Sequence, residues 1–298
     1  MGGRQVEKYH AAEHSIITKY KKTLFHKFVG AVKDYRLISK GDKIAVCISG
    51  GKDSMLLAKL MQELSRHGDY PFEMEFIVMD PGYHPQNRQR IIDNASLLEI
   101  PIKIFDTDIF SSVVNIHKNP CYLCARMRRG HLYKQAQLLG CNKIALGHHF
   151  DDVIETILMG MLYGAQVQTM MPRIKSTNFE GMELIRPMYY IREKDIISWR
   201  NYHQLEFLQC ACRFTEENDR IDGTGTSKRQ EVKRLIQTLK QTNPQVEYNI
   251  FRSVERVNLS TIISYYLEDE EHHFLERFED DCISQTGLSE RDDGDENE

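Results

Sequence analysis

A short stretch with two adjacent glycines, Ser-Gly-Gly-Lys-Asp-Ser at residues 49–54, constrains the fold of this chain more than any other feature. The residues directly before it, 43–48, are apolar and rich in β-branched side chains, which is typical of a central parallel strand. Residues 54–64 carry Met and Leu at spacings of three and four, which predicts a helix. The stretch is therefore predicted to join a buried strand to a helix.

A turn of this kind can bind phosphate, because backbone N–H groups at the glycines converge at the positive end of the helix dipole. The spacing does not fit a Walker loop, which places four residues before its Gly-Lys pair. An ordinary strand-to-helix turn is the alternative, but the complete sequence in this context favours phosphate binding. The predicted phosphate-binding residues are Ser49, Gly50, Gly51, Lys52, Asp53 and Ser54.

Strand-like and helix-like segments alternate along the chain. Further strands are predicted at 72–79, 101–105, 143–146, 184–186 and 205–208, and further helices at 87–98, 130–139 and 152–163. Such alternation predicts an α/β fold, with a doubly wound parallel sheet of about five strands and right-handed crossovers. We expect a helical segment before this sheet and a helical extension after it.

The net charge of −4 conceals an uneven distribution. Residues 265–298 contain fourteen acidic and two basic side chains, a net charge of −12, so the preceding residues carry +8. An acidic stretch of this kind is expected to be largely disordered, and the basic remainder allows a nucleic-acid partner. No apolar run approaches the ~20 residues that span a bilayer, so we expect a cytoplasmic protein without a membrane partner.

A Cys-x-x-Cys pair, Cys121 and Cys124, precedes the arginines Arg126, Arg128 and Arg129. Two cysteines at this spacing can bind one metal, and the arginines would favour the thiolate form. Seven cysteines in a chain without a secretion signal favour metal binding or catalysis over disulfides. The pair alone leaves zinc, iron and a redox dithiol open.

Cys210 and Cys212 could complete a metal site if their loop lies at the same edge of the sheet. Three thiolates would leave a coordination position open, as a site that holds an exchangeable sulfur atom requires. A fourth thiolate, from the second member of the late pair, would close the site and favour a structural zinc ion.

Polar residues are also predicted at the carboxyl ends of other strands, where open α/β sheets bind ligands. Asp80 follows the second strand, and Gly147, His148 and Asp152 belong to the block Gly-His-His-Phe-Asp-Asp at 147–152. In the alternative interpretation, Asp80 caps a turn and the block begins a helix with an N-cap. We expect Asp80, Gly147 and His148 to contact a nucleotide.

The chain resembles the tRNA 2-thiocytidine synthetase family, within the PP-loop ATP-pyrophosphatase superfamily, through its late cysteine pair and the motifs SGGKDS, CYLCARMRRGHLY, KIALGHHFDD and LIRPMYYIREKDI. This resemblance covers residues 37–239. It implies an ATP-dependent sulfurtransferase that adenylates the C2 oxygen of a cytidine in tRNA and replaces it with sulfur. It also implies ATP and Mg²⁺ as cofactors, and a 4Fe-4S cluster on Cys121, Cys124 and Cys212.

The resemblance assigns roles and partners. Lys52, Asp53 and Asp152 are the candidate catalytic residues, and the three arginines after the Cys-x-x-Cys pair are candidate tRNA contacts. The expected partners are tRNA and a sulfur donor, either a cysteine desulfurase or sulfide, and a homodimer is a candidate assembly. A tRNA 2-thiouridine synthetase, a lysidine-synthetase-like ligase and a zinc-stabilised ATP-binding regulator are the alternative functions.

Four segments are expected on this basis. An N-terminal helical segment spans 1–40, and the PP-loop domain with the iron-sulfur site spans 41–212. A C-terminal helical extension spans 213–264, and the acidic, largely disordered tail spans 265–298.

Overall fold

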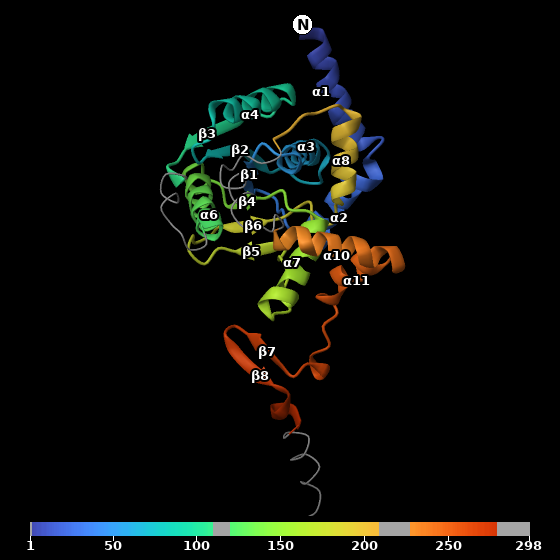
Figure 1. Cartoon of the computed structure of the whole chain (residues 1–298). Coiled ribbons are helices and arrows are strands. Elements are labelled where there is room, and N and C mark those ends of the chain that lie inside the picture. The colour runs from blue at the N-terminus through green and yellow to red at the C-terminus, as the bar shows by residue number, and fades with distance from the viewer. Residues whose placement is uncertain (1, 110–119, 209–226, 279–298) are drawn as a thin grey trace, which may run out of the picture. The chain divides into compact units, whose positions relative to one another are not determined.

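The computed structural model describes residues 2–109, 120–208 and 227–278 of the 298-residue chain (Figure 1). Two compact units divide the chain, residues 1–251 and residues 252–298. None of the helices among the described residues is long and apolar enough to cross a membrane. The division into four segments stays a prediction.

A six-stranded sheet forms the centre of the first unit, in the order β3-β2-β1-β4-β6-β5. The strands are β1 (Lys43–Ile48), β2 (Glu73–Asp80), β3 (Ile102–Asp106), β4 (Lys143–Ala145), β5 (Arg173–Lys175) and β6 (Glu183–Ile185). All neighbouring strands pair in parallel except β5, which is antiparallel to β6. The predicted α/β class and parallel sheet are therefore confirmed.

One strand was missed and one predicted strand was wrong. The antiparallel edge strand β5 was not predicted, because three residues are too short to show a period of two. Residues 205–208 were predicted as a strand, but they form no strand. Leu205, Phe207 and Leu208 are buried, and the Phe207 ring stacks on Trp199 at a centroid distance of 6.4 Å. The apolar run is thus explained by core packing without sheet pairing.

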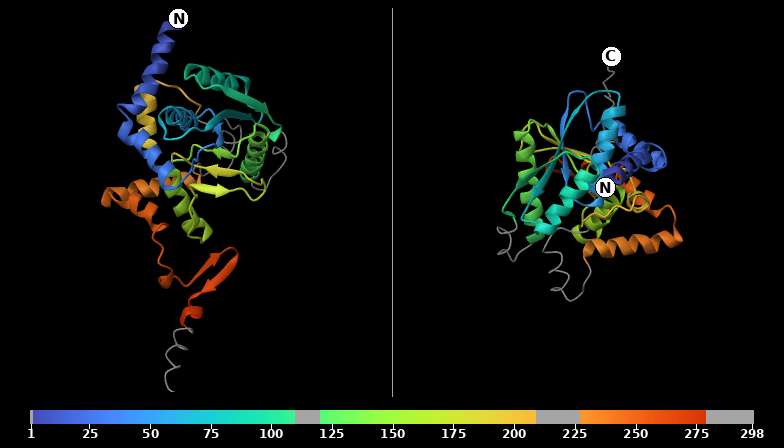
Figure 2. Two further views of the ribbon diagram at one scale, coloured as in Figure 1. Left: turned by 180° about the vertical axis from the view of Figure 1, so that it is seen from behind. Right: turned by 90° about the horizontal axis from the view of Figure 1, so that it is seen from above.

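Helices cover both faces of the sheet, as the view from above shows (Figure 2). The α-helices among the described residues are α1 (Gly2–Ile17), α2 (His26–Asp34), α3 (Lys52–His67), α4 (Pro85–Leu97), α6 (Pro120–Leu138), α7 (Phe150–Gly164), α8 (Glu193–Tyr202), α10 (Lys228–Thr242) and α11 (Val246–Ser253), with the short π-helix η1 (Lys21–Phe25). Alternate residues of β1 face opposite sides. Ile44 and Val46 join a core cluster with α1, α3 and α8, whereas Ala45 and Cys47 join a second cluster with Tyr133 of α6.

The second unit contains a short 3₁₀-helix η2 (Leu259–Thr261) and an antiparallel hairpin of β7 (Ser264–Leu267) and β8 (Glu270–His273). The hairpin turns at Glu268 and Asp269, which both have positive φ angles. The hairpin lies mostly in the segment for which we expected a largely disordered tail, and that expectation stays a prediction for the segment as a whole. Residues 279–298 lie outside the part of the chain that the structure describes.

Candidate active site

Two glycines allow the stretch at 49–54 to pack closely against its neighbours. Gly50 has φ +83°, and a Cβ atom on it would lie 2.6 Å from Cγ1 of Ile91. A Cβ on Gly147 would lie 3.1 Å from the carbonyl carbon of Asp53 and 3.2 Å from the amide nitrogen of Ser54. Both positions therefore need glycine, the first for its backbone angle and its space and the second for its space.

The Ser54 side chain holds this turn together from inside. Its buried Oγ accepts hydrogen bonds from the Ser49 N–H at 3.1 Å and from the Ser49 hydroxyl at 3.2 Å. It donates one to the Gly51 carbonyl at 3.0 Å. The turn is thus shaped before any ligand binds, with β1 ending at Ile48 and α3 beginning at Lys52.

A pocket of about 340 Å³ opens beside this turn, and we call it the active-site pocket. Five parts of the chain form its wall: the end of β1 with the turn, the ends of β2 and β4, α6, and the start of α7. The lining residues include Ser49, Asp53, Ser54, Met79, Tyr83, Arg128, Leu132, Gly147, His148 and Asp152. The structure thus brings together residues predicted from three separate motifs, although their roles stay predictions.

Nδ1 of His148 and Oδ1 of Asp53 are buried at this pocket, and neither makes a hydrogen bond to any residue that the structure describes. Oδ1 of Asp53 lies 3.8 Å from Nε2 of His149. Burial, followed by the charge of Arg186, lowers the pKa of His148 from 6.5 to about 4, so its imidazole is neutral at neutral pH. Buried polar groups are normally satisfied, so a ligand is the expected partner of both atoms.

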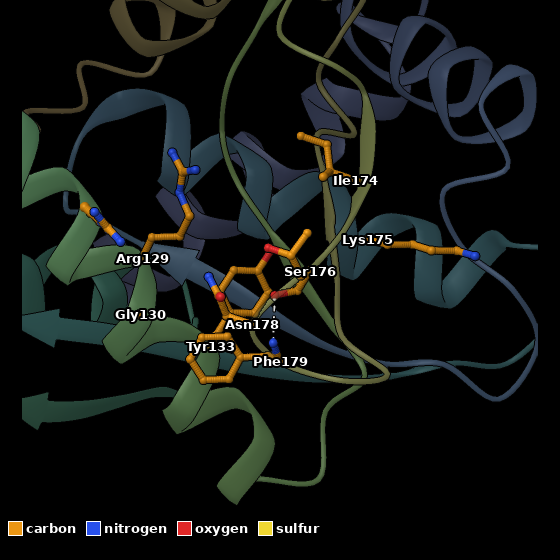
Figure 3. Close-up of a pocket in the computed structure, with 10 residues that line it drawn as sticks. Arg129, Gly130, Tyr133, Ile174, Lys175, Ser176, Asn178 and Phe179 are labelled. Atoms are coloured by element: carbon orange, nitrogen blue, oxygen red, sulfur yellow. Dashed lines mark hydrogen bonds between the residues drawn. The ribbon is translucent and has the colours of Figure 1, made fainter. Parts of the chain in front are cut away.

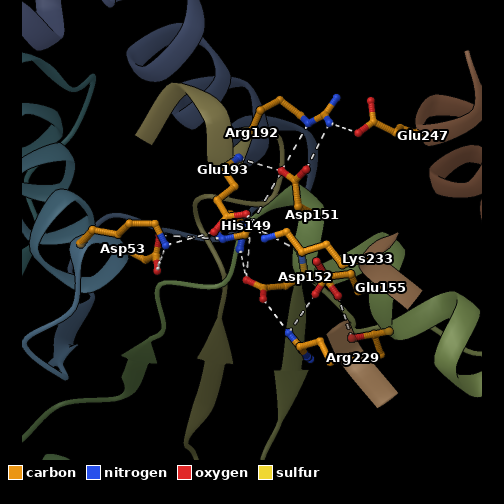
Figure 4. Close-up of polar contacts among 12 residues, drawn as sticks. Asp53, His149, Asp151, Asp152, Glu155, Arg192, Glu193, Arg229, Lys233 and Glu247 are labelled. Atoms are coloured by element: carbon orange, nitrogen blue, oxygen red, sulfur yellow. Dashed lines mark hydrogen bonds and ion pairs between the residues drawn. The ribbon is translucent and has the colours of Figure 1, made fainter. Parts of the chain in front are cut away.

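Figure 4 shows an ion-pair network that includes Asp53, Glu193 and Lys233. Nζ of Lys52 lies 3.1 Å from Oδ2 of Asp53 and 3.2 Å from Oε1 of Glu193, the first residue of α8. The other oxygen of Glu193 lies 2.5 Å from Nζ of Lys233 on α10. Burial alone would raise the pKa of Glu193, but the two ammonium groups outweigh it and hold the pKa at about 2.

Glu193 and Lys233 were missed in the sequence analysis. The only sequence signal for Glu193 is its place in the motif LIRPMYYIREKDI, at a predicted helix start. Lys233 lies 40 residues downstream and gives no local signal. Ion pairs between elements that are distant in sequence become visible only once the fold is known.

The block at 147–152 begins a helix, as the alternative interpretation held. The His149 side chain accepts from the Asp152 N–H at 3.4 Å, and Oδ2 of Asp152 accepts from the His149 N–H at 3.0 Å, which is a capping box. The other oxygen of Asp152 lies 2.8 Å from Arg229. Asp152 lines the active-site pocket with a carboxylate that already has partners.

Asp80 caps a turn, which was also the alternative interpretation. Its Oδ1 accepts from the N–H groups of Gly82 at 2.8 Å and Tyr83 at 2.7 Å, and its Oδ2 accepts from Arg88 at 2.8 Å. Asp80 is not among the residues that line the active-site pocket. It is hydrogen-bonded to the backbone of Tyr83, which does line the pocket, and its predicted contact with the nucleotide stays a prediction.

The Cys-x-x-Cys pair lies in the first turn of α6, which begins at Pro120. We expected the helix to begin near residue 130, although proline is common at the first helical position. Cys121 and Cys124 are therefore about one helical turn apart along α6. Cys210 and Cys212 lie outside the described residues, and within those residues no three His, Cys, Asp or Glu side chains gather as a metal site.

Two other cysteines, Cys47 and Cys141, belong to the core. Burial raises the pKa of the Cys47 thiol to about 12 and that of the Cys141 thiol to about 11, so both are unreactive at neutral pH.

Comparisons with known proteins agree on one family. Residues 16–219 match the model of a family described as PP-loop domain. The tRNA-cytidine(32) 2-sulfurtransferase of Coxiella burnetii (strain RSA 331 / Henzerling II) is 36% identical over 255 residues, which cover 84% of this chain and 95% of that protein. The enzyme of the same name from Bordetella pertussis is 34% identical and covers 84% of this chain and 77% of its own.

A solved structure shows the same fold. The U34-tRNA thiolase NcsA from Methanococcus maripaludis, determined with its 4Fe-4S cluster, matches with a TM-score of 0.60 at 22% identity. The match covers 78% of this chain and 77% of that one.

Proposed function

Because the chain belongs to the PP-loop family and, within it, to the tRNA-cytidine 2-sulfurtransferases, we propose that it is an ATP-dependent enzyme that converts a cytidine of tRNA into 2-thiocytidine. The observation that carries this proposal is the active-site pocket, where the glycine turn, His148 and α6 meet. That pocket joins a phosphate-binding turn to the helix that bears Cys121 and Cys124.

The first step is adenylation of the base. The phosphates of ATP bind at Gly50, Gly51 and Ser54, where the N-terminus of α3 favours negative charge. The C2 oxygen of cytidine attacks the α-phosphorus, an O–P bond forms, and pyrophosphate leaves with the electron pair of the broken bond. A sulfur nucleophile then attacks C2, the C2–O bond breaks, and the oxygen departs as part of AMP.

Lys52 and Asp53 serve the leaving pyrophosphate. The ammonium of Lys52 is held between two carboxylates, so it is positioned before ATP arrives. Oδ1 of Asp53 makes no hydrogen bond within the described residues and is a hard oxygen ligand of the kind Mg²⁺ prefers, and Mg²⁺ would neutralise phosphate charge. Asp152 and the neutral imidazole of His148 complete the wall beside the base.

The chemistry of the cysteines supports an iron-sulfur cluster. Cys121 and Cys124 are proposed to supply two thiolates, and Cys212 is proposed as the third ligand. Leu208, the last described residue before the late cysteine pair, donates its N–H to the Gly50 carbonyl at 3.2 Å. When bound, the cluster would supply a coordination position that holds the sulfur.

The test is thiolation of purified, unmodified tRNA under anaerobic conditions with ATP, Mg²⁺, a reductant and sulfide, followed by mass spectrometry of the nucleosides. We expect 2-thiocytidine together with AMP and pyrophosphate, and none of them when ATP is omitted. Thiolated uridine would support the 2-thiouridine alternative, and release of ADP would contradict the PP-loop mechanism. A protein that binds zinc and transfers no sulfur would support the regulator alternative.

A further inference from the structure

A second pocket, of about 460 Å³, lies beside α6 and is separate from the active-site pocket in the residues that line it (Figure 3). One wall is α6, and the other is β5 with the loop that follows it, residues 174–179. The motifs found in the sequence do not explain this pocket, because they include residues of its α6 wall but none of residues 174–179. Its size is within the range of small-ligand sites.

The charge of this second pocket is uniformly positive. Arg126, Arg129 and Lys175 line it, and none of its ten lining residues is acidic. All three side chains are exposed, and within the described residues none of them forms an ion pair. This differs from the active-site network, where Lys233 is bound by a carboxylate. The second pocket therefore has positive charge available for an anion.

An aromatic pair forms part of its lining. The rings of Tyr133 and Phe179 stack at a centroid distance of 5.1 Å with an angle of 15° between their planes. Tyr133 is buried and Phe179 is half-buried, so Phe179 is the ring that offers a surface to the pocket. The Phe179 N–H donates to the Ser176 hydroxyl at 3.2 Å, which fixes the loop. Basic groups beside an aromatic ring are the combination that binds single-stranded nucleic acid.

Helix α6 links the two pockets. Arg128 and Leu132 line the active-site pocket, whereas Arg126, Arg129 and Tyr133 line the second pocket. The three arginines predicted as tRNA contacts are thus divided between two sites on one helix. A strand of RNA with one base in the active-site pocket would pass α6 on its way to the second pocket.

We propose that the second pocket binds a nucleotide of the tRNA that neighbours the modified cytidine. Its phosphate lies at Arg126 and Arg129, Lys175 adds positive charge at the β5 wall, and its base stacks on Phe179. This inference rests on the proposed function, because the ligand is the same tRNA substrate. It assigns specificity for single-stranded RNA to a wall formed by the β5–β6 loop, which the sequence did not indicate.

The test compares the double variant Arg126→Glu/Lys175→Glu with the control Lys134→Glu. Lys134 is an exposed lysine on the same helix and lines neither pocket. tRNA and ATP dissociation constants are measured for each, between low and moderate salt. We expect the double variant to weaken tRNA binding at least tenfold and to flatten the dependence of log K on log salt by more than one unit, since each lost phosphate contact removes about 0.7. ATP affinity should stay within twofold of wild type.

A second variant tests the stacking surface. Phe179→Ala should weaken tRNA binding about tenfold without changing the salt slope, because stacking releases no counterions. Circular dichroism shows whether the fold of this variant is intact. If it is not, the double variant Arg126→Glu/Lys175→Glu, which changes only exposed side chains, still tests the proposal.

Equal tRNA affinity and salt slope in the double variant and in Lys134→Glu would overturn the proposal, and so would a parallel loss of ATP affinity. Either result leaves the proposed function standing, since that fails only if wild-type protein forms no 2-thiocytidine.

Discussion

Gly50→Ala should disrupt the phosphate-binding turn in two separable ways. Because φ at this position is +83°, an alanine must adopt a left-handed backbone conformation, which costs about 1–2 kcal/mol of stability. Its Cβ would also lie 2.6 Å from Cγ1 of Ile91, a buried side chain, and overpacking of this kind costs about 1–3 kcal/mol. We therefore expect the free energy of unfolding to fall by about 2–5 kcal/mol, a large part of the stability of an ordinary domain.

The chain contains a matched control for the backbone cost. Gly41 has the same φ of +83°, but a Cβ on it would meet nothing within 4 Å. Gly41→Ala should therefore cost about 1–2 kcal/mol from the backbone alone. Urea unfolding of both variants gives the two values, and their difference isolates the close contacts of the new Cβ with Ile91 and Leu208.

A double-mutant cycle tests the same contact from the other side. Ile91→Ala removes the two Ile91 atoms that the new Cβ meets and leaves only Cδ1 of Leu208 at 3.1 Å, so it should destabilise the Gly50→Ala protein less than it destabilises the wild type. ATP binding by calorimetry should weaken in Gly50→Ala and stay unchanged in Gly41→Ala. Equal losses of stability at Gly50 and Gly41, with no coupling to Ile91, would refute the reasoning.

Three further predictions follow from the site. Glu193→Gln should lower the free energy of unfolding by about 1–3 kcal/mol at pH 7; because the pKa of Glu193 is lowered from 4.5 to about 2, the difference from wild type should shrink as the pH falls below 4.5. The pKa of His148 is lowered from 6.5 to about 4, so the wild type should lose stability as the pH falls through that interval, and urea unfolding of His148→Gln should show a smaller loss. Cys121→Ala should abolish the iron-sulfur absorption of anaerobically reconstituted protein, whereas the core substitution Cys141→Ala should leave it unchanged.

Periodicity and turn chemistry predicted the centre of the fold correctly. Strand β1 has the predicted bounds, and β2, β3, β4 and β6 lie within two residues of theirs. These strands are buried on both faces or bounded by Gly and Pro, so their local sequence carries a strong signal. The short edge strand β5 lacks such a signal, and it forms because β6 offers a free edge.

The sequence predicted the motifs that form the candidate site, but it did not predict the ion pairs that connect their residues. Gly147 and His148 were placed near the nucleotide from sequence because they follow a parallel strand, and they do line the active-site pocket. The two ion pairs that connect Lys52 to Glu193 and Glu193 to Lys233 could not be predicted, because they join three helices that only the tertiary structure brings together. Asp80 lies at the predicted edge of the sheet, but its carboxylate accepts hydrogen bonds from backbone N–H groups of the turn that follows it.

The measurement that tests the central claim most directly is the fate of the cytidine oxygen. tRNA transcribed with oxygen-18 at C2 of its cytidines is thiolated by the purified protein under anaerobic conditions, and the released AMP is analysed by mass spectrometry. Adenylation of the base followed by displacement with sulfur predicts one labelled oxygen in AMP for each 2-thiocytidine formed. Unlabelled AMP, with the label lost to water or retained in the nucleoside, would contradict activation of the C2 oxygen by ATP.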